Sequence, residues 1–331
     1  MTTTKPEVGT RTDPTVGTGR SWRRIGLNAA RIVFTTAVLA AVVYSTATQW
    51  HDVKDHLLAI PWQSAVLSLV MVLVGLAAST MGWRAALTDV GHKVAVPTAS
   101  QIYLVGLLAK YLPGSLWAFV LQMELGRRAG VPRSRSFLAS LVSTGISTAI
   151  ALLLGVFGVG VLFDDAVGTP IRVVVLVLLP ISLVCAYPKV LTWLVQLFLR
   201  LVRRAPLTTP ITWRGVGSVA GWSVVAWVAM GIHLWLLANS QAAPGVSGVF
   251  VCIGAFALGM TAGMFAFLAP SGLGFREAIL VAALMPYVGA GVALSMALAS
   301  RMIFTIADLL AAGGAALLAL RARRTEAAPQ S

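Results

Sequence analysis

Long apolar runs, each ended by a short polar or basic loop, make up most of the chain between residues 29 and 320. Several of them reach the roughly 20 residues that a helix needs to cross a hydrocarbon core about 30 Å thick. Lipid cannot form hydrogen bonds with backbone N–H and C=O groups, so a membrane-spanning segment must be a helix or part of a closed barrel. The runs show no strict alternation of apolar and polar residues, which favours helices over a barrel. The pattern predicts an all-α, polytopic helical membrane protein with about 7–8 spans and one or two re-entrant broken helices. The expected full spans are 29–48, 62–82, 137–162, a run from 171, 216–238 and 289–320.

Two of these boundaries have alternative interpretations. The first run, Ile32–Thr48, follows several arginines and could be a signal peptide, but its length and unconvincing cleavage region favour a retained span. The run that begins near Ile171 either ends by Tyr187 or continues through Pro188. We expect three parts: a disordered cytoplasmic tail at 1–28, a single transmembrane domain at 29–320 and a cytoplasmic tail at 321–331.

Composition and charge fit this picture. Of 331 residues, 58% are hydrophobic and 11% charged, whereas a soluble domain carries about 25% charged residues. The formal net charge of +14 comes from basic loops that alternate along the chain. The positive-inside rule then predicts a multi-pass protein of the cell (cytoplasmic or inner) membrane with both termini cytoplasmic. No basic domain stands outside the runs, so nucleic acid is not an expected partner.

One segment, about 100–136, contains a break inside an apolar stretch. Basic residues precede it (Arg84 to Lys93) and also close it (Arg127 to Arg135), so both of its ends are expected on the cytoplasmic side. Each arm around Pro113-Gly114 has about 14 residues, or roughly 21 Å, which is too short to cross and return. The sequence therefore predicts a re-entrant hairpin that turns at Pro-Gly, which needs protein or a watery cavity around it.

A second broken segment, about 247–287, contains "APSGLGFRE". It forms either a re-entrant hairpin from the outer side or two full crossings, because both give the same end point. Interrupted segments in corresponding halves of a chain indicate a transport site and are compatible with inverted-repeat halves. The turn residues of the two breaks are Pro113, Gly114, Pro270, Gly272 and Gly274.

Five charged residues lie at membrane depth: Lys110, Arg276, Glu277, Arg301 and Asp308. Such residues are costly in a bilayer and should face a bundle interior or cavity. Ser115 and Ser271 each follow a break and can cap the next helix, whose start favours an anion.

We therefore expect Lys110, Ser115, Ser271, Arg276 and Arg301 to bind an anionic headgroup, with Glu277 and Asp308 as charge partners or proton carriers. The alternatives are a purely structural ion-pair network, ordinary capping, and a lysine that extends to the interface. Arg301 and Asp308 stand two turns apart, about 10 Å, and should meet different partners.

The sequence contains no catalytic or phosphate-binding motif, and its histidines and two cysteines are scattered. We expect no enzyme activity, no metal site and no cofactor.

"KYLPGSLW" (110–117), "ELGRRAGVPRSRSFLAS" (124–140) and "PSGLGFREAIL" (270–280) resemble the lysylphosphatidylglycerol synthase transmembrane-region family. That family includes the membrane portion of the bacterial multiple peptide resistance factor. The resemblance covers about 30–320, with Ser271 where the family usually has glycine. It implies a flippase-like membrane domain that moves phospholipid or another lipid-linked anion, without a synthase domain in this chain.

The leading hypothesis is thus a lipid flippase for an anionic phospholipid or polyprenyl-phosphate-linked lipid. One alternative is a non-transporting accessory subunit of a cell-envelope glycosyltransferase, bound through small-residue faces at Gly217/Gly221 and Gly259/Gly263. Another is a secondary transporter of small anions. The expected partners are membrane lipids with anionic headgroups, and either a membrane glycosyltransferase or further copies of the chain.

Overall fold

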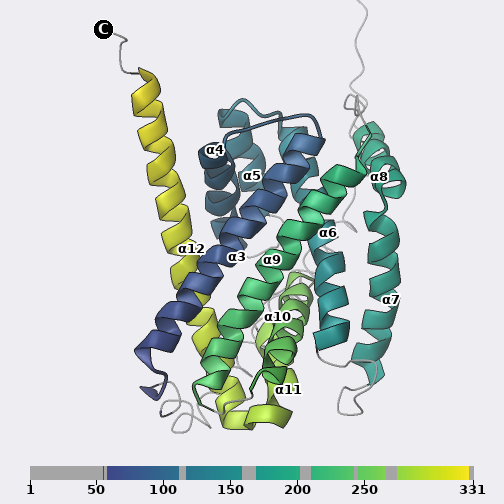
Figure 1. Cartoon of the computed structure of the whole chain (residues 1–331). Helices are drawn as coiled ribbons and strands as arrows, with labels where there is room; N and C mark the ends of the chain where they lie inside the picture. Colours follow the sequence, from purple (N-terminus) through teal and green to yellow (C-terminus); the bar gives the residue numbers. More distant parts are fainter. Residues whose placement is uncertain are drawn as a thin grey trace, which may run out of the picture.

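A computed structural model describes residues 55, 58–111, 117–158, 169–201, 210–241, 245–265 and 274–327, without the side chains of 169–175, 198, 265 and 320–327. The described residues are almost wholly helical and include no strand, which confirms the all-α fold (Figure 1). Five described helices are long and apolar enough to cross a membrane, or six if one bent pair counts as a span. The expected tail at 1–28 and the first span at 29–48 lie outside the described residues.

The centre of the bundle is an antiparallel pair, α3 (Trp62–Asp89) and α9 (Trp213–Asn239). Gly75 lets α9 approach closely, because a Cβ there would lie 2.7 Å from the Met230 side chain. At the far end of α3, Asp89 accepts hydrogen bonds from the Thr212 backbone N–H (3.0 Å) and hydroxyl (2.8 Å) at the start of α9. A carboxylate at a helix N-terminus is favourable, so this contact fixes how the two helices align.

Around this pair lie α6 (Arg133–Gly158), α7 (Thr169–Ala186), α8 (Pro188–Leu201) and the long α12 (Ala290–Ala327). The chain bends by 83° between α7 and α8. The bend falls at Tyr187, because a residue before proline disfavours helical geometry. The run from 171 therefore continues past Pro188, but as a second helix in a new direction.

The first broken segment is a helical hairpin. Its first arm consists of α4 (Val96–Ser100), the π-helix η1 (Gln101–Val105) and the 3-10 helix η2 (Leu108–Tyr111), and its second arm is α5 (Trp117–Arg128). Gly106 packs on Gln122, where a Cβ would lie 3.3 Å from the Gln122 Cα. Arg135 Nη1 donates to the Val90 carbonyl at 3.0 Å and so joins the two open ends. This confirms the predicted hairpin; its turn, 112–116, lies outside the described residues.

The second broken segment is also a hairpin, formed by α10 (Ser247–Phe265) and α11 (Phe275–Val288). Gly259 of α10 packs on α11, with a Cβ position 3.3 Å from the Arg276 carbonyl oxygen. The 14 residues of α11 span about 21 Å, too little for a full crossing. The two hairpins open toward opposite ends of the bundle (Figure 1). The segment is thus a helical hairpin in which α10, but not α11, is long and apolar enough to cross a membrane.

Candidate functional site

The end of the first arm of the first hairpin contacts α12. Lys110 Nζ lies 2.6 Å from Asp308 Oδ2, and the Tyr111 hydroxyl donates to the same oxygen at 2.6 Å. The Asp308 side chain is 2% exposed and the Lys110 side chain 21%. A buried carboxylate needs such partners, and Oδ2 has two of them, whereas Oδ1 has none among the described residues.

The start of α11 contacts α12 at Arg301, two turns before Asp308. Arg301 Nη1 donates to Glu277 Oε1 at 2.7 Å, and the other oxygen of Glu277 accepts the Gly274 backbone N–H at 2.8 Å. Gly274 has φ = 86°, a conformation that glycine adopts without strain. Glu277 therefore caps its own helix and holds Arg301 at the same time.

Arg276 is buried next to this pair and has no carboxylate partner among the described residues. Its Nη2 donates to Ser300 Oγ at 2.6 Å, and Ser300 Oγ also lies 2.9 Å from His233 Nε2. The guanidinium stands over the rings of Phe256 and Phe304, 5.1 and 4.8 Å from their centroids. Its Nε has no hydrogen-bond partner in the described part of the chain.

The charges of this cluster do not cancel. Lys110, Arg276 and Arg301 bring three positive charges, and Glu277 and Asp308 bring two negative ones, which leaves one positive charge. Aromatic faces stabilise a guanidinium by about 0.5–2 kcal/mol, far less than its desolvation costs. A further anion beside Arg276 would restore neutrality.

A cavity of about 250 Å³ lies between the two hairpins and α6, and both Lys110 and Arg276 line it. Much of its wall is apolar, and its uncharged polar side chains are Tyr103, Gln122, Ser140, Thr144, Thr148 and Thr261. The Thr261 hydroxyl is buried without a hydrogen-bond partner among the described residues. The cavity thus combines two cations with an apolar wall, which suits an anion attached to a hydrocarbon chain.

A family model for the lysylphosphatidylglycerol synthase TM region matches residues 28–312. The chain belongs to this family. A comparison with curated proteins gave no match. The family consists of membrane-embedded domains of lipid-related proteins, and the apolar helices agree with a multi-pass membrane protein.

For this member of the family, the structure brings together five of the charged residues that the sequence singled out. Lys110, Arg276, Glu277, Arg301 and Asp308 meet at one face of α12. Arg301 and Asp308 have separate partners, as expected. The contact of Arg301 with Glu277 fits the structural network interpretation for that residue, and Arg301 is not among the residues that line the cavity. The remaining predicted site residues (Pro113, Gly114, Ser115, Pro270, Ser271 and Gly272) lie outside the described residues.

Some residues of the cluster were not predicted. Tyr111, His233 and Ser300 supply neutral hydrogen bonds, and Phe256 and Phe304 supply the rings around Arg276. His233 did carry a signal, because a histidine inside an apolar run is costly and needs partners. The two phenylalanines carried none, since aromatic residues are common in every span.

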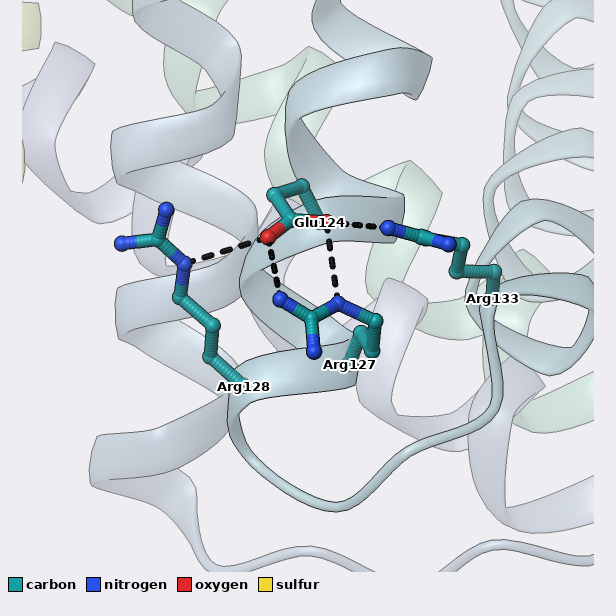
Figure 2. A network of polar contacts seen from close by, with 4 residues as sticks. All are labelled: Glu124, Arg127, Arg128 and Arg133. Atoms are coloured by element: carbon teal, nitrogen blue, oxygen red, sulfur yellow. Dashed lines mark hydrogen bonds and ion pairs between the residues drawn. The ribbon is translucent and has the colours of Figure 1, made fainter.

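A second charged cluster lies outside this site, at the end of α5 (Figure 2). Glu124 binds Arg127 (2.7 Å), Arg128 (3.2 Å) and Arg133 (2.7 Å). These hydrogen bonds hold the pKa of Glu124 well below its usual range, and the one from Arg127 has the largest effect. Glu124 thus pairs with two arginines of its own helix, and Arg133 extends the cluster to the start of α6. The cluster joins the end of α5 to the start of α6 at the bundle surface.

Within the described ranges, no group of three or more His, Cys, Asp or Glu side chains is placed to hold a metal ion. Cys185 and Cys252 are free thiols on different helices.

Proposed function

We propose that this chain moves the headgroup of an anionic lipid across the cell membrane and that Arg276 and Lys110 bind its phosphate. The observation that carries the proposal is the buried Arg276 guanidinium, which faces the cavity without a carboxylate partner among the described residues. Anionic phospholipids and polyprenyl-phosphate-linked lipids both offer such a phosphate. Ser115 and Ser271 lie outside the described residues, and α11 begins at Phe275 with Gly274 as its N-cap, so no donor is assigned at these two positions.

We propose that a headgroup reaches this site from either side of the membrane, past one hairpin or the other. One opens toward the end of the bundle where α3 ends, and the other toward the opposite end (Figure 1). A headgroup that enters past either hairpin reaches the same cations, while its tails stay in the bilayer. The positive-inside rule assigns the end with the α5–α6 arginines to the cytoplasm, and both termini with it.

Exchange of ion-pair partners would drive the movement. When the phosphate arrives, Lys110 can turn from Asp308 to the anion. Asp308 then keeps only the Tyr111 hydroxyl as a hydrogen-bond partner among the described residues. Lipid binding at Lys110 would thus break the ion pair between the first hairpin and α12.

Reconstituted vesicles test this proposal. We expect acyl-labelled phosphatidic acid, which carries a bare phosphate headgroup, to exchange between leaflets in vesicles that contain the protein. Arg276→Gln should abolish most of this exchange, whereas Arg200→Gln, the same change at an exposed residue of α8, should not. Equal exchange by folded Arg276→Gln and the wild type would refute the assigned site. Exchange of soluble phosphate instead of lipid would indicate a small-anion transporter.

One observation supports the accessory-subunit alternative. A Cβ at Gly217 or Gly221 would meet no atom within 4 Å in the described structure, so this face of α9 is open to a foreign helix. Gly259, in contrast, packs within the chain against α11. A stoichiometric membrane partner that Gly217→Leu releases, together with no lipid movement by the chain alone, would favour this alternative.

A further inference from the structure

Hydroxyl groups cover one face of α6. Ser143, Thr144, Ser147 and Thr148 are spaced at three and four residues and therefore share a face. They line a second cavity of about 180 Å³ together with Ser79 of α3 and Ser223 of α9. Together with Tyr103, seven side chains with a hydroxyl group line this one cavity inside a membrane bundle.

The second cavity adjoins the cavity of Arg276. Tyr103, Thr144, Thr148 and Met264 line both. A ligand whose phosphate lies between Lys110 and Arg276 would therefore extend its next groups past Thr144 and Thr148, into the hydroxyl-lined space.

The hydroxyls of this space keep free capacity to accept. Ser143 donates to the Ser140 carbonyl at 3.2 Å and Ser223 to the Val219 carbonyl at 2.8 Å. A serine hydroxyl has one proton but two lone pairs, so each can still accept a hydrogen bond. The Trp227 indole donates to Ser147, at 3.0 Å to its carbonyl and 3.1 Å to its hydroxyl, which orients that residue.

No aspartate or glutamate is among the described residues that line either cavity. The two carboxylates of the charged cluster are engaged, Asp308 with Lys110 and Glu277 with Arg301. An ammonium group would thus enter without a counter-charge, next to a cluster that already carries one excess positive charge. Burial of an unpaired charge is far more costly than burial of a hydrogen-bonded hydroxyl.

From this arrangement we infer that the transported lipid carries a neutral, polyhydroxylated headgroup beyond its phosphate, such as glycerol or a sugar, rather than an amine-bearing one. This inference rests on the proposed function, because it takes the phosphate to lie at Lys110 and Arg276. Thr144 and Thr148 are the specificity-determining residues, since they stand where the two cavities meet.

Binding of three short-chain lipids to the detergent-purified protein tests the inference. The probes are the dioctanoyl forms of phosphatidic acid (phosphate only), phosphatidylglycerol (phosphate and glycerol) and phosphatidylethanolamine (phosphate and ammonium). We expect phosphatidylglycerol to bind at least about fivefold more tightly than phosphatidic acid, which is the lower limit for two added hydrogen bonds. Phosphatidylethanolamine should bind more weakly than either.

Isosteric variants show which residues discriminate. Thr144→Val/Thr148→Val should reduce the affinity for phosphatidylglycerol to that for phosphatidic acid and leave the latter unchanged. Thr88→Val is the matched control, because Thr88 lines neither cavity and donates to its own helix at the Arg84 carbonyl. The unliganded melting temperature of each variant shows that it is folded.

The outcomes separate the two proposals. If no probe binds, or if Arg276→Gln binds all of them as the wild type does, the phosphate site and the proposed function fail. If phosphatidic acid binds through Arg276 but glycerol adds no affinity, or ethanolamine binds equally well, only the headgroup inference is overturned. Retained preference for phosphatidylglycerol in the double valine variant overturns the role of the two threonines.

Discussion

Lys110 and Asp308 form an ion pair of 2.6 Å between the first hairpin and the last helix. Arg301 and Glu277 form the equivalent contact of 2.7 Å between that helix and the second hairpin. One face of α12 thus connects both broken segments, which enter the bundle from opposite ends (Figure 1). Because the two pairs are neutral, the charge of Arg276 remains available for a ligand.

Removal of the Asp308 charge should destabilise the fold. In Asp308→Asn, Lys110 loses its carboxylate partner in a largely buried position, which costs about 3 kcal/mol. The double variant Lys110→Met/Asp308→Asn should recover most of this loss, because both charges are then absent. Thermal unfolding of the wild type, the two single variants and the double variant in detergent measures this double-mutant cycle. Additive effects of the two substitutions would show that Lys110 and Asp308 do not interact energetically.

Close packing of the first hairpin predicts a contrast between two glycines. Gly106→Ala should lower the stability by about 1–3 kcal/mol, since the new methyl group meets the Gln122 side chain and lies 3.3 Å from its Cα. Gly217→Ala meets no described atom and should raise it by about 0.5–1 kcal/mol through helix propensity. Melting temperatures that fall equally in both variants would contradict the hairpin packing.

The Glu124 cluster predicts a pH dependence (Figure 2). Arg127, Arg133 and Arg128 hold the pKa of Glu124 low in the folded state. The folded protein therefore binds a proton at Glu124 less readily than the unfolded chain, in which the glutamate pKa is about 4.3. The stabilisation is therefore complete above that pH and is lost as the pH falls through the folded pKa. At pH 7 the melting temperature of the wild type should be higher than that of Glu124→Gln. The difference between the two melting temperatures should shrink as the pH falls.

Ser182→Ala, which removes no ionisable group and alters only a hydroxyl bonded to its own helix, is the control for this pH series. A difference between wild type and Glu124→Gln that stays constant from neutral pH into strong acid would mean that the three arginines do not act through this carboxylate.

Loss of the Ser300 hydroxyl should destabilise the fold, as loss of its charged neighbours does. Ser300→Ala removes the partner of both Arg276 Nη2 and His233 Nε2 and leaves these buried groups unpaired, at a cost of about 1–3 kcal/mol. Ser182→Ala, where the hydroxyl donates to the Leu179 carbonyl of its own helix, should change little. Thermal unfolding of the two variants distinguishes them, and equal midpoints would exclude a bridging role for Ser300.

The architecture followed from local signals in the sequence. Apolar length indicated the spans, and basic residues on both flanks of Pro113-Gly114 indicated a hairpin rather than a crossing. The pairing inside the site did not follow, because Tyr111 and Asp308 meet across 197 positions. No local pattern determines which carboxylate takes which cation. The rings around Arg276 were equally hidden, since Phe256 and Phe304 look like ordinary lipid-facing residues in their helices.

The central claim is that the uncompensated Arg276 binds the phosphate of a lipid headgroup. The most direct test is the affinity of dioctanoyl phosphatidic acid for the wild type, Arg276→Gln and Arg200→Gln in the same detergent. Loss of one charged contact should weaken binding about tenfold or more in Arg276→Gln and leave Arg200→Gln unchanged. Equal affinity in all three folded proteins would contradict the account.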